Sequence, residues 1–389
     1  MVDFGSLFLY YYPIGINYAQ ILFRALFLRE RTRWLIPLGY GRFFYSILMK
    51  EGFLIMFFKS KKFLAVGMML SMMAFAAGCG GGDKKAEAPK KDAAKVVNVG
   101  IVQLVEHQAL DDSRKGFIEG MKKKGFVEGK NVKYDVQNAQ ADQSNLQTIA
   151  QRFVNNKVDL ICAISTPAAQ TMANATKDIP IVGNAITSFE IAKLVKSDKK
   201  PETNVTGASD MAPVAAQLDL GMKLKPGTKK VGLMFTSSEM NSQVQIKIAE
   251  EHLKKAGVAY EEGSVNTVND IQEIARSLVS KGVDFIYVPT DNIIASATPA
   301  LVAITNEAKI PVVAADAILL KNGATASVNI EFFQLGVVSG EMAADILSGK
   351  SKPQDMPIAF QKDFTPSINK AQADKLGLKI PEDLAKFAK

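Results

Sequence analysis

The chain contains the same structural unit twice. Residues 142–161 and 267–286 align without a gap at an offset of 125 residues, and seven of the twenty aligned positions are identical. In both copies apolar residues at helical spacing are followed by a short apolar run that opens with Val-Asp, as at Val158. This pattern predicts a helix followed by a buried strand. Two related units at this spacing predict two similar lobes rather than a solenoid.

Each unit alternates strands with helices. In the first unit we expect strands over 96–104, 131–137, 158–164 and 179–183, and helices over 112–124, 143–156 and 167–176. In the second we expect strands over 230–235, 258–263, 284–288 and 311–314, and helices over 239–256, 269–281 and 293–308. A further helix over 331–348 is expected to pack back on the first lobe. Strict alternation predicts an α/β fold of two lobes, each a parallel sheet covered by helices on both faces. Ligands of such sheets bind beyond the carboxyl ends of the strands, so we expect a ligand cleft between the lobes.

A secretory leader precedes the first unit. Lysines at 59, 61 and 62, an uncharged apolar stretch over 63–75 and small residues before Cys79 predict a signal peptide over 56–78. The cysteine after the small residues resembles the lipobox of bacterial lipoproteins, which implies that Cys79 is lipidated, for example with palmitate. Residues 79–95 are polar and are expected to form a flexible tether. The alternative is an ordinary signal peptide with a free Cys79.

Residues 1–55 do not fit a signal sequence. They show no helical or strand period, and Met56 begins a normal signal. We interpret residues 1–55 as translated upstream DNA, with an additional membrane segment as the alternative.

The charge balance gives no support for a nucleic-acid partner. The whole chain carries a net charge of +8, but residues 1–79 hold nine basic and three acidic residues, so their removal leaves about +2. A basic footprint of the kind that binds nucleic acid is therefore not expected.

An enzyme is the competing class. A Cys162–His107 pair would need an exposed and activated thiol, whereas Cys162 lies in the apolar run 158–164 and is interpreted as buried. No metal-ligand cluster or phosphate-binding glycine loop follows a strand. We expect no catalytic residue, no metal and no cofactor.

Polar residues after the strands form the candidate ligand site. Two loops place hydroxyl groups at a helix start, which suits a carboxylate, while Glu239, Asp291 and Asp316 are candidate partners for an ammonium group. Alternatively, Ser165, Ser238 and Asn241 are only helix caps, and Asp291 and Asp316 only turn residues. The expected ligand-binding residues are Gln103, Ser165, Thr166, Asn184, Ser238, Glu239, Asn241, Thr290, Asp291 and Asp316.

Six of these residues lie in stretches that resemble a known family, the substrate-binding lipoproteins of ABC uptake systems in the tryptophan/tyrosine-type group. The stretches that carry the resemblance are 99–103, 106–111, 116–120, 163–170, 204–210, 287–292 and 310–316. The resemblance implies a type I periplasmic-binding-protein-like fold of two Rossmann-like lobes. It also implies a small-molecule ligand, an aromatic or large apolar amino acid, delivered to an ABC permease. It also implies a monomer held by its lipid anchor on the extracytoplasmic face of the cell membrane. A ligand-binding sensor lipoprotein, or a binding protein for a sugar or nucleoside, is the alternative.

The chain departs from the family pattern at two places, Ser188–Glu190 and Phe332–Phe333, where Asp-Pro and tyrosine are usual. We expect an N-terminal lobe of 96–209 plus about 317–347 and a C-terminal lobe of 210–316 plus about 348–389. The crossings between lobes are expected at 203–209, at 314–316 with 324–330, and near 346–358.

Overall fold

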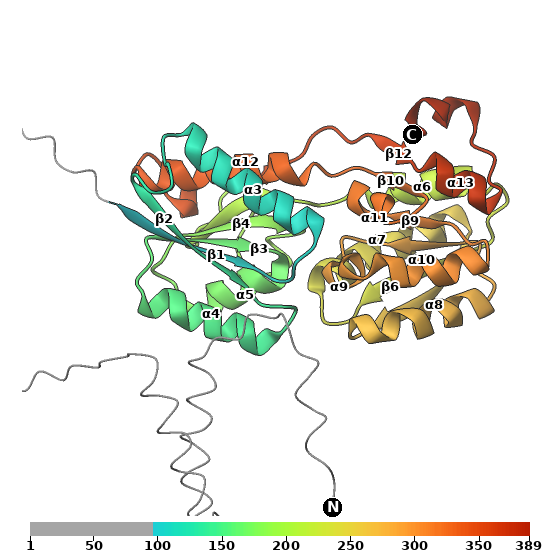
Figure 1. Cartoon of the computed structure of the whole chain (residues 1–389), viewed down its shortest axis with the longest axis horizontal. Helices are drawn as coiled ribbons and strands as arrows, with labels where there is room; N and C mark the ends of the chain where they lie inside the picture. The colour runs from blue at the N-terminus through green and yellow to red at the C-terminus, as the bar shows by residue number, and fades with distance from the viewer. Residues whose placement is uncertain (1–95) are drawn as a thin grey trace, which may run out of the picture. The chain divides into compact units, whose positions relative to one another are not determined.

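The computed structural model describes residues 96–389, which form two α/β lobes (Figure 1). Residues 1–95, and with them the expected upstream segment 1–55, signal peptide 56–78, Cys79 and tether 79–95, lie outside the described residues. The first sheet has the strand order β11-β5-β4-β3-β1-β2 and the second has the order β12-β10-β9-β8-β6-β7. Read from β2 and from β7, both follow the doubly wound order 2-1-3-4-5. The duplication and the fold class expected from the sequence are thereby confirmed.

Short segments form the strands, and those inside each sheet are mostly apolar and buried. In the first lobe they are β1 Val97–Gln103, β2 Val132–Asn138, β3 Leu160–Ile164, β4 Ile181–Ile186, β5 Val205–Ser209 and β11 Ala359–Phe360. In the second they are β6 Lys230–Thr236, β7 Ala259–Val265, β8 Phe285–Val288, β9 Val312–Ala314, β10 Ala326–Val328 and β12 Pro366–Ile368. Neighbouring strands pair in parallel except β10 with β12. Strands buried on both faces, such as β3, explain the continuous apolar runs in the sequence.

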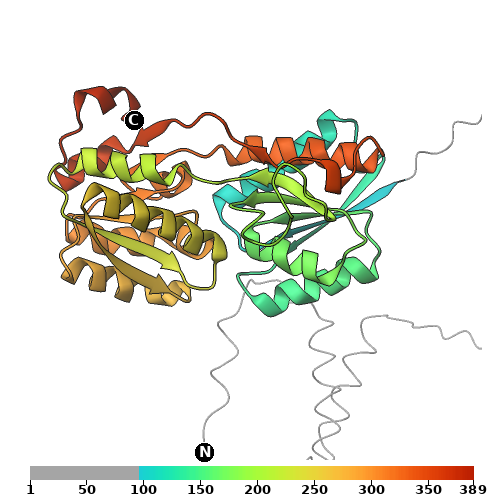
Figure 2. The same ribbon diagram turned by 180° about the vertical axis from the view of Figure 1, so that it is seen from behind.

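Helices cover both faces of each sheet. In the first lobe α3 Gln108–Lys123 and α12 Phe332–Leu347 lie on one face, and α4 Gln143–Asn155 and α5 Thr166–Ala175 lie on the other (Figure 1). In the second lobe α8 Ile271–Ser280 and α10 Thr298–Glu307 face the viewer in Figure 1, whereas α6 Val214–Leu224 and α7 Met240–Ala256 face the viewer in Figure 2. The shorter helices are α9 Asn292–Ser296, α11 Ala317–Lys321 and α13 Lys370–Leu376. No helix between residues 96 and 389 combines the length and the apolar character of a membrane span.

One expected helix is divided in two. The sequence pattern predicted a single helix over 293–308, whereas the structure has α9 and α10 with a break at Ala297. Pro299 lies in the first turn of α10. Proline lacks the N–H group that would continue the hydrogen-bond ladder of the preceding helix, so a new helix begins there.

Three segments connect the lobes, and they differ from the expected crossings. Residues 203–209 are largely β5 of the first sheet, and the chain crosses after them at 210–213. Residues 317–328 belong to the second lobe, because β10 pairs with β9, so the second crossing is 329–331. The third lies at 361–365, because β11 pairs with β5 and only β12 returns to the second sheet. The short strand β10 had been interpreted as part of a connection, and β11 had not been predicted.

Two of the crossings are joined by one side chain. The amide nitrogen of Gln361 donates to the carbonyl oxygen of Asn329 at 3.1 Å, and its amide oxygen accepts from the N–H of Glu331 at 2.9 Å. The second and third crossings therefore run side by side (Figure 1 and Figure 2).

Helices α3 and α12 pack at backbone contact. A Cβ atom on Gly336 would lie 2.2 Å from the carbonyl oxygen of Ser113, and one on Gly116 would lie 2.1 Å from that of Phe333. Glycine is thus required at both positions for the helices to approach this closely. Because α12 begins directly after the second crossing, this packing fixes that crossing to the first lobe.

Candidate functional site

A small cavity lies between the facing edges of the two lobes. Its volume is about 20 Å³, which is room for about one water molecule. His107, Thr166 and Thr187 line it from the first lobe, and Thr290 and Asp316 from the second. These residues follow the carboxyl ends of their strands, where doubly wound sheets bind their ligands. The cavity is therefore the candidate binding site.

The lobes touch each other across this cavity. The hydroxyl oxygens of Thr187 and Thr290 are 3.1 Å apart, and Nε2 of His107 lies 3.3 Å from Oδ1 of Asn292. Burial lowers the pKa of His107 to about 4, so the ring is neutral at pH 7. These contacts describe a closed arrangement.

The carboxylate of Glu239 is used within the second lobe and does not line the cavity. It accepts hydrogen bonds from the backbone N–H groups of Asn292 and Ile293, both at 3.1 Å, and from the side-chain amide of Asn241 at 2.8 Å. Glu239 therefore caps the start of α9. The sequence had suggested it as a partner for a ligand ammonium, a role for which its oxygens are already occupied.

Asp291 lines the cavity, but its carboxylate is also fully engaged. It accepts from the backbone N–H and the hydroxyl of Thr236 at 2.6 and 2.8 Å, from the hydroxyl of Ser242 at 2.8 Å and from the N–H of Ile294 at 2.9 Å. Burial raises the pKa of Asp291, and burial together with the charge of Asp291 raises that of Glu239. The pair thus ties together the loops after β6 and β8.

Two other carboxyl groups remain available to the cavity. Asp210 accepts one hydrogen bond, from the hydroxyl of Thr187 at 2.9 Å, and Asp316 uses one oxygen to accept the N–H groups of Ile318 and Leu319. Burial raises the pKa of Asp316 to about 6, and burial followed by the charge of Asp316 raises that of Asp210 to about 6. Two neighbouring buried carboxyl groups of this kind can stabilise a positive charge placed between them.

Asp210 was not predicted from the sequence as a site residue, although its position at the end of a strand indicates one. It directly follows β5, as Asp316 follows β9 shortly after that strand ends. Because residues 203–209 were interpreted as a crossing, the residue after them was not counted among the ends of strands.

Three polar atoms at the cavity have no hydrogen-bond partner. They are Oγ1 of Thr166, Oδ1 of Asn241 and Nδ1 of His107, all in side chains that line it. The orientation of the Asn241 amide is determined, because its nitrogen donates to Glu239 and, at 2.8 Å, to the carbonyl oxygen of Thr290. A buried polar atom without a partner is costly, so all three atoms are expected to contact a ligand.

The remaining expected residues lie outside the cavity wall. Gln103 donates to Asp111 at 2.9 Å and Asn184 to the carbonyl oxygen of Ser113 at 3.0 Å, both within the first lobe. Ser165 caps α5 with φ at 97° and lies behind Thr166. Ser238 is exposed. The structure therefore brings together Thr166, Asn241, Thr290, Asp291 and Asp316 of the ten expected residues.

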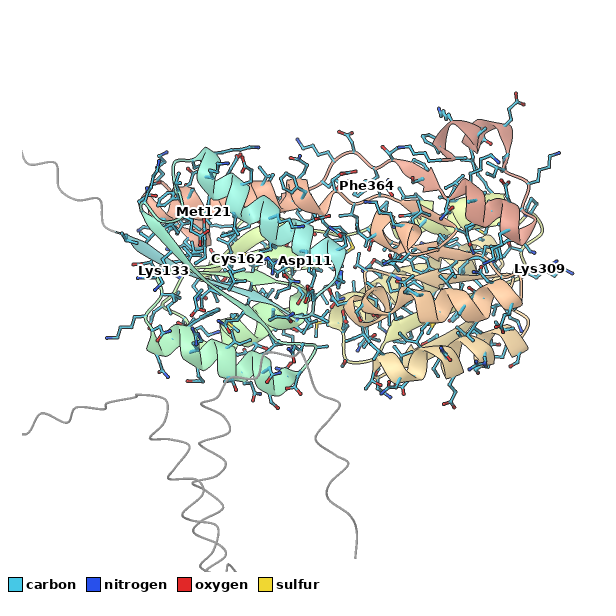
Figure 3. All side chains as sticks on the ribbon, in the orientation of Figure 1. Asp111, Met121, Lys133, Cys162, Lys309 and Phe364 are labelled. Carbon is cyan, nitrogen blue, oxygen red and sulfur yellow. The ribbon has the colours of Figure 1, made fainter. Side chains whose placement is uncertain are left out.

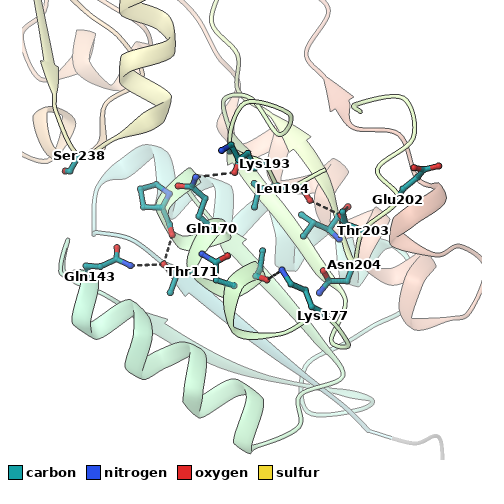
Figure 4. A pocket seen from close by; sticks show the side chains of 15 residues that line it. Gln143, Gln170, Thr171, Lys177, Lys193, Leu194, Glu202, Thr203, Asn204 and Ser238 are labelled. Carbon is teal, nitrogen blue, oxygen red and sulfur yellow. Dashed lines mark hydrogen bonds between the residues drawn. The ribbon is translucent and has the colours of Figure 1, made fainter. Parts of the chain in front are cut away.

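A larger groove of about 710 Å³ lies on the first lobe, and Ser238 of the second lobe reaches its edge (Figure 4). Two of its polar side chains are paired within the first lobe: Gln143 donates to Thr171 at 3.1 Å, and Gln170 donates to the carbonyl oxygen of Ala192 at 3.2 Å. Apart from Ser238 its lining residues come from the first lobe, whereas both lobes line the small cavity.

Cys162 lies inside the first lobe (Figure 3), fully buried in β3. Burial raises the pKa of its thiol well above the ordinary value. The interpretation of Cys162 as a buried apolar residue is confirmed. In the part of the chain that the structure describes, no group of three His, Cys, Asp or Glu residues could hold a metal ion.

Comparison with known proteins gives consistent matches over this region. The family model described as ABC transporter substrate binding protein matches residues 98–389. The tyrosine-binding protein of Clostridioides difficile (strain R20291) is 40% identical over 336 residues, which cover 85% of this chain and 97% of the relative.

Two solved structures are similar in both sequence and fold. An ABC domain from Streptococcus pneumonia in complex with L-Trp is 38% identical, with a TM-score of 0.73, and the match covers 76% of this chain and 99% of that one. The ligand-free, open structure of a substrate binding protein with adhesive properties from Clostridium difficile is 43% identical, with a TM-score of 0.58 and coverage of 74% and 97%. The open structure is more similar in sequence but superposes less well, which agrees with the closed arrangement of the lobes here.

Proposed function

The chain belongs to the family of ABC transporter substrate-binding proteins, and we propose that it binds an aromatic or large apolar amino acid between its lobes. We further propose that it is a monomer anchored by lipidated Cys79 on the extracytoplasmic face of the membrane, and that it delivers the ligand to an ABC permease. The tyrosine and tryptophan named for two relatives suggest the ligand class.

One observation carries the ligand proposal: Asp210 and Asp316 both line the cavity as buried carboxyl groups with raised pKa values. An ammonium group between them would restore their ionised form and compensate for their burial. The unpaired hydroxyl of Thr166, at the start of the ten-residue helix α5, is suited to the ligand carboxylate. Leu110, Ala295 and Phe332 supply apolar wall for the side chain.

Binding requires the lobes to separate. An aromatic amino acid is far larger than the cavity of about 20 Å³, so it enters an open form and the lobes close around it. The three short crossings allow this motion, because a hinge needs only a few residues that absorb the change in backbone angles.

A thermal-shift screen of the full chain in detergent tests the ligand class. L-Tyr, L-Trp, L-Phe and L-Leu are compared with glucose and adenosine at equal concentration. We expect a rise in melting temperature with at least one of the aromatic amino acids, because a ligand that binds only the folded state stabilises it. A rise with glucose or adenosine and with none of the amino acids would refute the proposal.

The anchor and the start of the mature chain are tested by mass spectrometry of protein from native membranes. We expect Cys79 as the first residue, carrying acyl groups, and release of the Cys79→Ala variant from the membrane fraction. An unmodified Cys79, or peptides from residues 1–55, would contradict this part. Co-purification with an ABC permease tests delivery.

A further inference from the structure

The wall of the interlobe cavity has an imbalance of charge. Asp210, Asp291 and Asp316 line it, and among the described residues that form its wall there is neither Lys nor Arg. His107 is neutral, because burial lowers its pKa to about 4. A ligand carboxylate therefore meets no cationic side chain here, whereas a ligand ammonium meets two carboxyl groups that have oxygen atoms to spare.

Helix starts are the other common partners of a carboxylate, and two of those in the second lobe are already occupied. The N–H groups at the start of α9 donate to Glu239 and Asp291, and those at the start of α11 donate to Asp316. The protein's own carboxyl groups thus fill these two places. The starts of α5, α3, α7 and α12, where Thr166, Leu110, Asn241 and Phe332 line the cavity, are not filled by a carboxyl group.

An independent observation points in the same direction. Asn241 lines the cavity and is 5% exposed, and its Oδ1 atom has no hydrogen-bond partner. This amide oxygen can only accept a hydrogen bond. Its position is fixed, because the amide nitrogen donates to Glu239 and Thr290. A ligand ammonium group provides the N–H donor that this acceptor lacks, whereas a carboxylate provides none.

We propose that the ammonium group of the ligand, held by Asp210, Asp316 and Asn241, supplies most of the polar recognition, so that decarboxylated arylalkylamines such as tyramine and tryptamine are also ligands of this protein. The inference rests on the proposed function and extends its ligand class from amino acids to the amines derived from them.

Isothermal titration calorimetry of the full chain in detergent tests this with three pairs of probes: L-Trp and L-Tyr, tryptamine and tyramine, and the deaminated acids indole-3-propionate and 3-(4-hydroxyphenyl)propionate. We expect each amine to bind within about tenfold of its amino acid, and each deaminated acid to bind about 30-fold more weakly or worse, because a buried charge then loses its partner. Deaminated acids that bind as tightly as the amines, or more tightly, would overturn the inference while leaving the amino-acid function intact. If none of the six probes binds, the proposed function fails and the inference fails with it.

Isosteric variants separate the contribution of the ligand's ammonium group to binding from that of its carboxylate. Asp316→Asn keeps the oxygen that caps α11, and Asp210→Asn keeps the acceptor for Thr187, so both are expected to fold. We expect each to weaken the binding of amino acids and amines about tenfold or more, with little effect on the deaminated acids. Thr166→Val is expected to weaken amino acids but not amines, and Ser238→Ala, outside the cavity, to change neither. Amine binding that is unchanged in both Asp variants would overturn the inference.

Discussion

The carboxylate of Glu239 contacts the backbone N–H of Asn292 with both oxygens, at 3.1 and 3.2 Å. This contact joins the loop after β6 to the start of α9, and so fixes the face that the second lobe presents to the cavity. Glu239 is therefore a structural residue, and its removal is expected to change stability before it changes ligand contacts.

Glu239→Ala is expected to lower the free energy of unfolding by about 3 kcal/mol, because it leaves buried N–H groups of Asn292 and Ile293 without an acceptor. Denaturant unfolding monitored by circular dichroism measures the change. The matched control is Glu262→Ala, at an exposed position on β7, with an expected change within about 0.5 kcal/mol. Equal losses of unfolding free energy in the two variants would show that the Glu239 contact contributes no more to stability than the exposed side chain of Glu262 does.

The contact between α3 and α12 gives a second prediction. Gly336→Ala places a Cβ atom 2.2 Å from the carbonyl oxygen of Ser113, and backbone cannot yield as a side chain can. We expect a loss of about 2 kcal/mol or more in stability. In Gly232→Ala the nearest atom is a side-chain carbon of Ile286 at 3.2 Å, so a smaller loss is expected. Thermal unfolding compares the two, and a Gly336→Ala protein at least as stable as Gly232→Ala would contradict the packing described here.

Closure without ligand is expected to respond to pH through Asp210 and Asp316. Their pKa values rise from 3.8 to about 6 in the closed form, whereas water reaches them when the lobes separate. The closed form then binds more protons between these values, so the two carboxyl groups favour closure at low pH and this contribution is lost as pH rises through about 6. In the His107→Gln variant, small-angle scattering should detect a more compact ligand-free protein at pH 5 than at pH 7.5. A compactness that is constant, or that increases with pH, would exclude this role.

His107 is expected to change the pH dependence of lobe closure in the opposite direction to Asp210 and Asp316. Burial lowers its pKa from 6.5 to about 4, so an open form binds more protons at this residue and closure weakens as pH falls through the ordinary value. The double variant Asp210→Asn/Asp316→Asn isolates this effect, because Glu239 and Asp291 stay within the hydrogen bonds of the second lobe. The same scattering measurement should find this variant less compact at pH 5 than at pH 7.5. A variant that becomes more compact on acidification would contradict the assignment.

Sequence patterns predicted most of the fold because its signals are local. Apolar runs such as 160–164 and the helical spacing of Leu146, Ile149 and Phe153 report burial directly. The segments that were misread are short: β10 has three residues and β11 has two. Only pairing with distant strands identifies them as part of a sheet.

The site was predicted less completely, for a physical reason. The loops after the strands were expected to meet, and Thr166, Asn241, Thr290, Asp291 and Asp316 do line one cavity. Which polar atoms remain free for a ligand depends on hydrogen bonds between loops, such as those from Asn292 to Glu239, and single-residue chemistry does not reveal them.

A crystal structure of the complex with L-Tyr or L-Trp tests the central claim most directly. The expected result is a ligand between the lobes with its ammonium nitrogen about 3 Å from the carboxylates of Asp210 and Asp316. A ligand in the groove beside Gln170, or one whose ammonium group faces away from both carboxylates, would contradict this account.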